Sequence, residues 1–538
     1  MAKNYQINQK RDFNPFNRVE VDVPQRNTFD LSHDNKLTLD MGKLVPVLVQ
    51  DTLPGDKFTI TPEMLIRFAP MTFPIMQKID ATIHFFYVPN RISWDNWKKF
   101  LANEKLEGSE YAPLSFRGDD STDKLKVTTS SLLDYIGLPN GRIGNMDIDA
   151  FPVLAYFRIY NEYYQDQNND SSYKTVRTFL ENMVKKQGGV IEPSDFAPGL
   201  TQYGDVLLLL NRAWEHDYFT SALPWAQKGD AVNIPLELIS LTGTATGNDL
   251  VKFDGSPAHN GALSSDSGHL WDTTPTAVWL KSNLDIDTQD AELSGTINQL
   301  RTAMALQKFL EKNARSGTRY NELILAHFGE HIGDARINRP EYLGGIQNNV
   351  VISEVLQTSQ TDDSSALGDY AGHATAVVNG NTIQFECPEH GYIIGILSVK
   401  PTTSYFQGIP RKFTRRTFLD YYWQEFAHIG EQAILNQELY YDVSLTDNTD
   451  TFGYIPRYSE YKYNPSAIHG NFRTDMKDFH LARYFSSRPA LNKSFIEVND
   501  DKRIFAVTEE GVNSLYAHIF FNIKADRKIP FFTSPQGL

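Results

Sequence analysis

The strand-like segments of this chain are short, and they lie hundreds of residues apart. Residues 79–88 alternate in polarity, which predicts a β-strand with one apolar and one polar face. The apolar positions are Ile79, Ala81, Ile83, Phe85 and Tyr87, and the polar positions are Asp80, Thr82 and His84. Other strand candidates are residues 350–355, 382–386, 392–399, 503–507 and 516–523, and residues 43–49, where Pro46 predicts an edge strand. Such distant strands can pair only through long-range contacts, so the sequence predicts a mainly β, antiparallel sandwich of the Greek-key or jelly-roll kind.

Helical periodicity occurs in three longer segments. Residues 152–165 begin with a proline, which the first turn of a helix accepts. Residues 296–314 carry the capping box Thr296-x-x-Gln299 and stop near Gly317, and residues 414–429 are rich in aromatic side chains. A shorter helix is predicted after Ser93, with that serine as its N-cap. No strand–helix alternation surrounds these segments, so we expect them in long loop insertions of a β framework.

The chain has 538 residues, whereas a single core stops growing at roughly 250–300 residues. Composition divides it into residues 1–28, 29–229, 230–296 and 297–538. Residues 230–296 are acidic and rich in Gly, Ser and Thr, yet they keep Phe253, Trp271 and Trp279, which favours an exposed, partly folded insertion. A flexible surface loop explains that composition equally well. Residues 1–28 are polar and mildly basic, and they predict an extended arm or a disordered terminus.

The formal net charge of −15 argues against a protein whose main task is to grip nucleic acid. Local contacts with nucleic acid would use the basic residues of the arm, namely Lys3, Lys10, Arg11 and Arg18. The densest basic cluster is Arg411, Lys412, Arg415 and Arg416, and Phe413 and Phe418 lie beside it. Arginine mixed with aromatic rings can hold phosphates and stack on unpaired bases. Salt bridges across a contact between subunits explain this cluster equally well.

Sequence patterns that would support catalysis or metal binding are weak. His327-x-x-Glu330-His331 matches a zinc pattern, but Gly329 interrupts the helix that this chemistry needs, so we favour a surface histidine pair. The acidic runs at residues 145–149 and 285–290 lack the glycine and distal glutamate of a calcium loop. The single cysteine, Cys387, cannot form an intrachain disulfide and is expected to be a buried structural thiol. We therefore expect no catalytic residue, metal or cofactor.

No stretch reaches the roughly 18 consecutive apolar residues of a membrane span, and residues 1–10 lack an apolar signal core. These features predict a protein that is made and folded in a cytosol. The abundance of aromatic residues and carboxylates suggests an alternative function, a carbohydrate-binding or carbohydrate-active β-sandwich. A monomer that releases sugar from a glycan, and a secretion signal, would favour that alternative.

Nine segments resemble, in the same order along the chain, the major capsid proteins of microviruses, the small single-stranded-DNA bacteriophages, and in particular the gokushovirus branch. They are FDLSHDNKLTLDMGKLVPV (29–47), PGDKF (54–58), RFAPMTFPIM (67–76), FFYVPNRISWDNWKKF (85–100), HDYFTSALPWAQKG (216–229), INQLRTAMALQKFLEKNARSGTRYNELILAHFG (297–329), DARINRPEYLGG (334–345), GYIPRYSEYKY (453–463) and HLARYFSSRPALNKSFI (480–496). Each segment alone is weak, but together they span most of the chain and are specific.

This resemblance implies an eight-stranded antiparallel jelly roll whose long loops contain helices, with strands drawn from residues 29–229 and 297–538. It implies a T=1 icosahedral shell of identical subunits around circular single-stranded DNA, assembled in the cytoplasm of a bacterial host. Residues 1–28 would lie inside the shell, and residues 230–296 would form a protrusion at the three-fold axes that meets a host surface receptor. The other expected partners are a small basic DNA-associated protein and a minor pilot protein.

Overall fold

The computed structural model describes residues 25–106, 109–110, 112–169, 173–196, 199–230, 232, 250–252, 264–266, 269–271, 278–280, 297–317, 319–356, 370–509 and 511–531. The chain divides into two compact units. The large unit comprises Met1–Ala226 and Ser316–Leu538, and the small unit is Gln227–Arg315.

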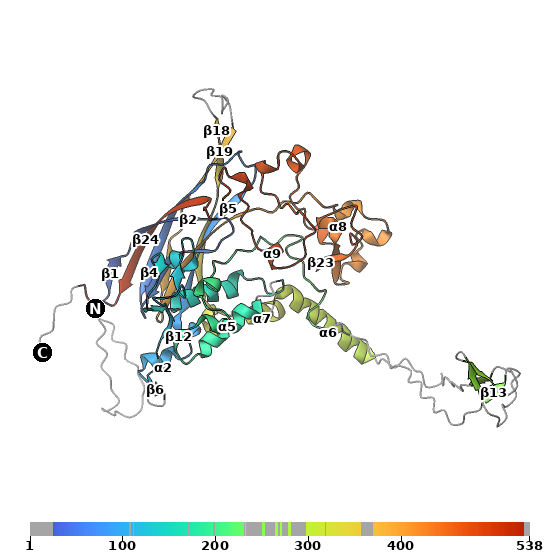
Figure 1. Cartoon of the computed structure of the whole chain (residues 1–538), viewed down its shortest axis with the longest axis horizontal. Helices are drawn as coiled ribbons and strands as arrows, with labels where there is room; N and C mark the ends of the chain where they lie inside the picture. Colours follow the sequence, from blue (N-terminus) through green and yellow to red (C-terminus); the bar gives the residue numbers. More distant parts are fainter. Residues whose placement is uncertain are drawn as a thin grey trace. The chain divides into compact units, whose positions relative to one another are not determined.

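The first main sheet of the large unit has seven strands. Its order is β1-β24-β4-β19-β18, with β2 also paired to β24 and β20 also paired to β4, and every pairing is antiparallel. The strands are β1 (Asn27–Asp30), β2 (His33–Leu39), β4 (Lys57–Phe68), β18 (Val351–Leu356), β19 (Tyr370–Asn379), β20 (Ile383–Glu386) and β24 (Leu515–Arg527). Figure 1 shows β18 and β19 reaching beyond the other strands as a hairpin. The longest pairing joins β24 to β4, segments about 450 residues apart in the sequence.

The second main sheet has four antiparallel strands in the order β17-β5-β21-β3. They are β17 (Glu341–Asn349), β5 (Ile79–Pro89), β21 (Gly391–Pro401) and β3 (Val45–Thr52). Pro46 lies in β3, at the edge of the sheet, as the sequence predicts for a residue that cannot donate to a central ladder. The strands expected around residues 350–355, 382–386, 392–399 and 516–523 are also present.

The two main sheets pack face to face around one hydrophobic core. Alternate residues of each strand enter it, such as Phe58, Ile60 and Ile66 from β4 and Ile519, Phe521 and Ile523 from β24. This alternation follows from the two-residue repeat of a strand. The prediction of a mainly β, antiparallel fold is confirmed.

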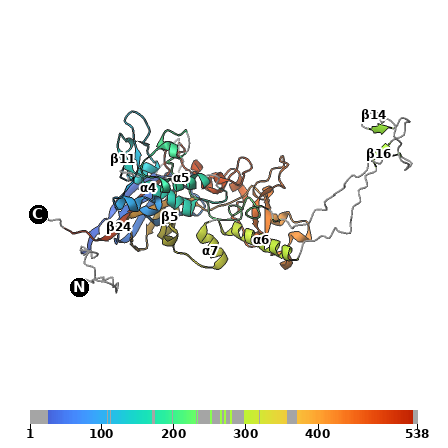
Figure 2. The ribbon, with the colours of Figure 1, turned by 90° about the horizontal axis from the view of Figure 1, so that it is seen from below.

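The polar face that alternation predicts for β5 does not face solvent. Asp80 and Thr82 are buried, with exposed fractions of 1% and 2%. The outer face of the four-stranded sheet carries a second core, in which Phe86 and Val88 pack with residues of helices α4 (Phe151–Ile159) and α5 (Tyr173–Lys185). Figure 2 shows these helices beside β5. Alternation within a strand shows which of its faces is polar, but the elements that pack on that face decide whether it is exposed to solvent.

A third core joins segments of little regular structure. It includes Tyr218, Phe219 and Tyr405 with residues of β22 (Glu431–Leu435), β23 (Thr451–Pro456), α8 (Asn436–Leu439) and α9 (Lys493–Ile496). The large unit also contains shorter α-helices and strands. They are α1 (Asn90–Ser93), α2 (Trp97–Leu101), α3 (Leu132–Ile136), α7 (Tyr320–Phe328), β6 (Lys105–Leu106), β7 (Ser109–Glu110), β8 (Leu114–Arg117), β9 (Lys126–Val127), β10 (Gly141–Arg142), β11 (Asp147–Asp149) and β12 (Gly189–Ile191).

In the small unit, β13 (Leu250–Lys252) pairs with β16 (Val278–Leu280), and β14 (Ser264–Asp266) pairs with β15 (His269–Trp271). Helix α6 (Ile297–Ser316) ends at Gly317, whose φ of +96° is the left-handed conformation of a glycine cap. The helix expected over residues 152–165 is α4 continued by a π-helical turn, η2 (Tyr160–Tyr164). Both long helices are therefore confirmed, whereas the capping residue Thr296 lies outside the described residues.

Three local predictions are wrong. Ser93 ends α1, and the next helix, α2, follows Asn96 instead. Residues 414–429 form two 3-10 turns, η7 (Phe418–Asp420) and η8 (Gln424–Phe426), because the Asp420 side chain accepts hydrogen bonds from the backbone N–H of Arg416 and Thr417 and competes with a helix. Residues 503–507 form no strand. Ile504 and Phe505 are both buried, and the Asp501 side chain caps a 3-10 turn, η12 (Lys502–Ile504).

Candidate interaction surface

The loop that follows β21 exposes large apolar side chains. Phe418 is 68% exposed, although phenylalanine is usually buried in a folded domain. We call the exposed aromatic side chains of this loop, together with Tyr461, whose ring packs against Tyr422, the aromatic surface. Its members are Phe413, Phe418, Tyr421, Tyr422, Trp423 and Tyr461. Exposed apolar patches of this kind mark sites of interaction with other molecules.

Local hydrogen bonds hold the aromatic surface in shape without burying it. The indole N–H of Trp423 donates to the Phe418 carbonyl at 2.8 Å, and the Tyr458 hydroxyl donates to the Tyr421 carbonyl at 3.2 Å. The ring of Tyr422 packs edge-on against those of Tyr458 and Tyr461, with interplanar angles of 63° and 66°. Because its rings are already ordered, little conformational entropy would be lost when a partner covers this surface.

Two arginines of the basic cluster already have partners inside the chain. Arg411 donates to the Ala433 carbonyl at 2.9 Å and lies 3.6 Å from the buried Glu438 carboxylate. Burial raises the pKa of Glu438, and the charge of Arg411 opposes that rise. Arg415 lies over the Tyr461 ring, 4.3 Å from its centroid, and 4.0 Å from Glu460. Both arginines therefore help to fix the loop.

Lys412 and Arg416 are exposed members of the same cluster. Lys412 lies over the ring of Phe413 at 5.1 Å. Within the described ranges, no carboxylate lies within ion-pair distance of either side chain. These two cations remain open to an anion from outside the chain.

Other predicted contact residues fall in parts of the chain with limited description. Lys3, Lys10, Arg11, Arg18 and Phe253 lie outside the described residues. Trp271 is the last residue of β15 and Trp279 is the middle residue of β16 in the small unit, and only their backbone is described.

The histidine pattern at residues 327–331 does not form a helical pair. Helix α7 ends at Phe328, and Gly329 caps it with a φ of +73°. His327 therefore lies in the helix, whereas His331 lies beyond it. In the parts of the chain that the structure describes, no group of three or more metal-ligating side chains is gathered in one place.

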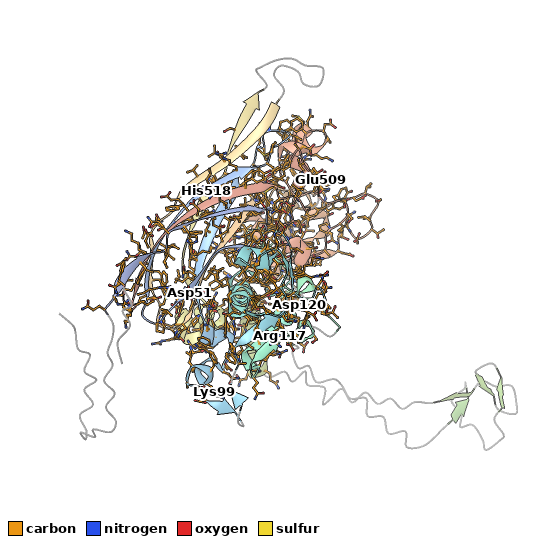
Figure 3. All side chains as sticks on the ribbon, turned by 60° about the vertical axis from the view of Figure 1, so that its left-hand side comes forward. Asp51, Lys99, Arg117, Asp120, Glu509 and His518 are labelled. Carbon is orange, nitrogen blue, oxygen red and sulfur yellow. The ribbon has the colours of Figure 1, made fainter. Side chains whose placement is uncertain are left out.

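The acidic residues at 145–149 have separate partners. Asp147 pairs with Arg117, the Tyr392 hydroxyl donates to Asp149 at 2.8 Å, and the Asn145 amide donates to Asp120 at 2.8 Å. Arg117 and Asp120 are labelled in Figure 3. Residues 285–290, the second acidic run, lie outside the described residues.

Cys387 is fully buried, as expected for a structural thiol. Burial raises the pKa of this thiol to about 12, so the sulfur is a neutral thiol at neutral pH.

No helix among the described residues is both long enough and apolar enough to span a bilayer.

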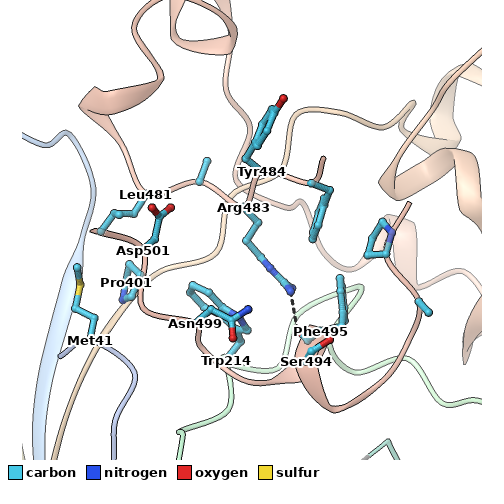
Figure 4. Close-up of a pocket in the computed structure, with 14 residues that line it drawn as sticks. Met41, Trp214, Pro401, Leu481, Arg483, Tyr484, Ser494, Phe495, Asn499 and Asp501 are labelled. Carbon is cyan, nitrogen blue, oxygen red and sulfur yellow. Dashed lines mark hydrogen bonds between the residues drawn. The ribbon is translucent and has the colours of Figure 1, made fainter. Parts of the chain in front are cut away.

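A cavity of about 260 Å³ beside α9 holds a buried guanidinium. Arg483 packs against the ring of Phe495 at 4.0 Å and donates to the Phe495 carbonyl at 2.6 Å (Figure 4). Its second amino group donates to the Tyr405 hydroxyl, which itself donates to Asp217 at 2.7 Å. Because these contacts occupy Arg483, the cavity is part of the structural framework.

Sequence reasoning missed part of the exposed apolar surface. Val443 is 85% exposed and Tyr441 is 43% exposed, in a turn-rich segment between α8 and β23. Both belong to the run YYDVSLTDNTD, which has neither helical nor strand periodicity. The signal available in the sequence was the presence of apolar residues in a segment without helical or strand periodicity, which indicates that they are not part of a core.

The chain matches known proteins along most of its length. The family model described as capsid protein (F protein) matches residues 18–536. Capsid protein VP1 of Bdellovibrio phage phiMH2K is 35% identical, over 92% of each chain. The VP1 proteins of Chlamydia phage 1 and Spiroplasma virus 4 are 32% and 25% identical, over 97% and 95% of each chain.

Proposed function

Because this chain belongs to the phage capsid protein (F protein) family, we propose that its copies close into a T=1 icosahedral shell around circular single-stranded DNA. It is a structural capsid protein of a microvirus-type bacteriophage, and its place is the shell of the virion, which is built from identical subunits. The aromatic surface is the observation that carries the assembly proposal. A closed symmetric shell needs such complementary patches on every subunit.

Strand order supports an eight-stranded jelly roll as the wall of this shell. β1 and β2 pair one after the other with β24, and β19 and β20 do the same with β4, so each couple acts as one interrupted strand. In chain order the eight strands are then β1/β2, β3, β4, β5, β17, β19/β20, β21 and β24. The first sheet joins strands one, eight, three and six, and the second joins two, seven, four and five. Two nested Greek keys produce this alternation.

The aromatic surface supplies a driving force for assembly. Each apolar side chain removed from water contributes roughly 25 cal/mol per Å² of buried area. In the single chain, Phe418 and Trp423 leave that contribution unused, since they are 68% and 48% exposed. A second copy that covers them recovers it.

Contacts with the genome form a separate part of the proposal. We assign the arm residues Lys3, Lys10, Arg11 and Arg18 to the DNA side, together with the basic cluster. Lys412 and Arg416 are open to phosphates, whereas Arg411 and Arg415 hold the loop that presents them. The net charge of −15 means that a small basic DNA-associated protein must supply most of the neutralising charge.

Residues 230–296 are assigned to a three-fold protrusion that contacts a receptor on the bacterial surface. The compact unit Gln227–Arg315 encloses this segment, which supports a separate role for it. Phe253, Trp271 and Trp279 are the side chains that we assign to the host contact. Assembly in the host cytoplasm, together with a minor pilot protein, completes the proposal.

Electron microscopy and sedimentation of the purified full chain test the shell. We expect uniform closed particles from the parent chain and folded, unassembled subunits from the double variant Phe418→Ser/Trp423→Ser. Tyr516→Ser is the matched control, because Tyr516 is 45% exposed on β24, outside the aromatic surface. If the parent chain remains a monomer at high concentration, the proposal that it assembles into a shell is wrong. Normal assembly of the double variant overturns the role of the aromatic surface.

A further inference from the structure

The outer face of the four-stranded sheet changes in chemistry along its strands. On β5 and β21, the outward-facing partners are Phe86 with Ile394, then Thr82 with Ser398. The second core covers the apolar half. Farther along, Asp80 lies opposite Lys400, so the remaining half of this face is polar.

Arg212 lies over the polar half. Its guanidinium donates to the hydroxyl groups of Thr82 and Ser398, and its backbone N–H is held by the Gly42 carbonyl at 2.7 Å. Within the described residues, no carboxylate forms an ion pair with Arg212. Partial burial lowers the pKa of Arg212, and a partly buried guanidinium whose hydrogen-bond partners are neutral hydroxyls favours an incoming anion.

Aromatic rings also line this cavity, which has a volume of about 360 Å³. The imidazole of His84 stacks on Tyr164 with ring centroids 6.0 Å apart, and Tyr342 meets His84 edge-on at 5.8 Å. Burial and the nearby charges of Arg212 and Lys400 lower the pKa of His84 to about 4, so this ring is neutral at pH 7. Tyr342 is 49% exposed, and its ring is therefore accessible.

Two acidic groups lie near the cavity and limit its positive charge. Glu215 pairs with Lys400 at 2.8 Å, and because the Lys400 side chain is only 5% exposed, an incoming anion reaches it only by taking the place of the Glu215 carboxylate as the partner of this buried ammonium group. Asp80 is buried in the sheet and lies 3.3 Å from Lys78. An anion in the cavity would therefore contact Arg212 first and Lys400 after Glu215 moves away.

We infer that this cavity binds one nucleotide of single-stranded DNA, with the phosphate at Arg212 and Lys400 and the base against Tyr342. An inorganic anion would leave the aromatic lining unused, and an apolar ligand would leave the charge of Arg212 without a counter-charge. A nucleotide uses both the aromatic rings and the charge, and stacking on an aromatic ring needs no particular base. The inference rests on the proposed function in one respect, because the packaged genome would supply the strand.

Binding of a fluorescent oligothymidylate to the full chain tests this inference, with an abasic strand of equal length and inorganic phosphate as competitors. We expect the parent chain to bind the thymidylate strand about ten-fold more tightly than the abasic strand, because stacking stabilises the base. Tyr342→Ser should abolish this difference. Arg212→Gln should weaken the binding of both strands. It should also reduce the slope of log affinity against log salt concentration by about 0.7, as expected for the loss of one phosphate contact on a single strand.

Tyr516→Ser and Arg142→Gln are the matched controls, since they remove an exposed ring and an exposed cation that do not line the cavity. Equal affinities of the parent chain and the Tyr342→Ser and Arg212→Gln variants would overturn the inference, and so would competition by inorganic phosphate as strong as that by the thymidylate strand. If Arg212→Gln fails to fold, Tyr342→Ser decides the question, because its side chain is half-exposed. Shells that form normally while both variants bind like the parent chain would refute the nucleotide site alone, whereas a parent chain that forms no shells would refute the proposed function.

Discussion

Gly42 is held in a backbone conformation that glycine adopts at low cost. Its φ is +78°, its N–H donates to the Val399 carbonyl at 2.8 Å, and its carbonyl accepts from Arg212. A Cβ atom at this position would lie 2.6 Å from the Val498 carbonyl oxygen. Both the dihedral angle and the close approach therefore exclude a side chain.

We predict that Gly42→Ala lowers the free energy of unfolding by about 3 kcal/mol, the sum of backbone strain and overpacking. Gly141→Ala is the matched control. Gly141 also has a positive φ, +119°, but a Cβ atom added there would have no neighbour within 4 Å, so we expect a loss of about 1 kcal/mol from strain alone. Chemical denaturation measures both values, and equal losses would show that the contact with Val498 is unimportant.

His84 should make the stability of the chain depend on pH. Burial, followed by the charges of Arg212 and Lys400, lowers its pKa from 6.5 to about 4 in the folded state. Between these two values the unfolded chain binds a proton that the folded chain does not, so stability falls as the pH falls from 6.5 towards 4. Above pH 6.5 the residue is neutral in both states and has no effect.

We predict that His84→Gln reduces the loss of unfolding free energy between pH 7 and pH 4 by about 3 kcal/mol, measured by denaturation at several pH values. Tyr164→Phe is the control, because it removes the hydroxyl that bonds to His84 at 2.8 Å while it preserves burial and the neighbouring charges. That variant should keep the pH dependence of the parent chain. The prediction would be contradicted if the parent chain and His84→Gln lost the same unfolding free energy between pH 7 and pH 4.

At the scale of elements, β24 shows how one strand serves two environments. Its residues alternate between buried and exposed positions, with Phe521 fully buried in the first core and Tyr516 45% exposed. The ring of Phe521 meets Phe85 of β5 edge-on at 6.4 Å, so this strand contributes directly to the contact between the two main sheets.

We predict that Phe521→Ala lowers the free energy of unfolding by about 3–5 kcal/mol, through lost burial and a cavity between the sheets. Tyr516→Ala on the same strand should change it by less than about 1 kcal/mol, because that side chain is half-exposed. Thermal or chemical unfolding of the two variants gives the comparison. Similar losses in both would mean that the interior of the sandwich is not the main source of stability.

Residues 414–429 show why an aromatic pattern with helical spacing is not sufficient for a helix. A short helix is stable in a protein mainly when its apolar stripe packs on a neighbouring element. Here Phe418, Tyr421 and Trp423 are all exposed, so such packing is absent within the chain. Turns capped by Asp420 are formed instead, and they leave the rings free for a partner.

At the scale of the whole molecule, two units serve what we propose are separate tasks. The large unit contains the three cores and both main sheets, whereas Gln227–Arg315 is compact by itself. The strands of the large unit come from both sides of this segment in the sequence. A change confined to the small unit should therefore leave those cores intact.

We predict that replacement of residues 235–290 by a short Gly/Ser linker leaves shell assembly largely unchanged and reduces attachment of the phage to its host. Electron microscopy reports the first property, and adsorption of particles to cells reports the second. The Phe418→Ser/Trp423→Ser variant should instead lose shell assembly, since it changes the aromatic surface and spares the small unit. Loss of soluble, shell-forming protein after the deletion would contradict the assignment of residues 230–296 as an insertion.

Local rules of the chain were sufficient for much of the framework. Polarity that alternates every second residue identified β5, Pro46 identified β3 as an edge strand, and Gly317 identified the end of α6. The strand candidates at residues 392–399 and 516–523 correspond to β21 and β24. The prediction of a buried Cys387 was also correct. Each of these features depends on residues close together in the sequence, because backbone dihedrals and hydrogen bonding act over short range.

Burial and the grouping of distant residues were decided only by the tertiary structure. Asp80 and Thr82 of β5 are buried where the chain around Arg212 covers the sheet, whereas helices α4 and α5 cover Phe86 and Val88, and no pattern within β5 reports either cover. The cavity at Arg212, His84, Tyr342 and Lys400 joins four segments that are distant in sequence. Such contacts depend on which layers pack together, and that is a property of the whole chain.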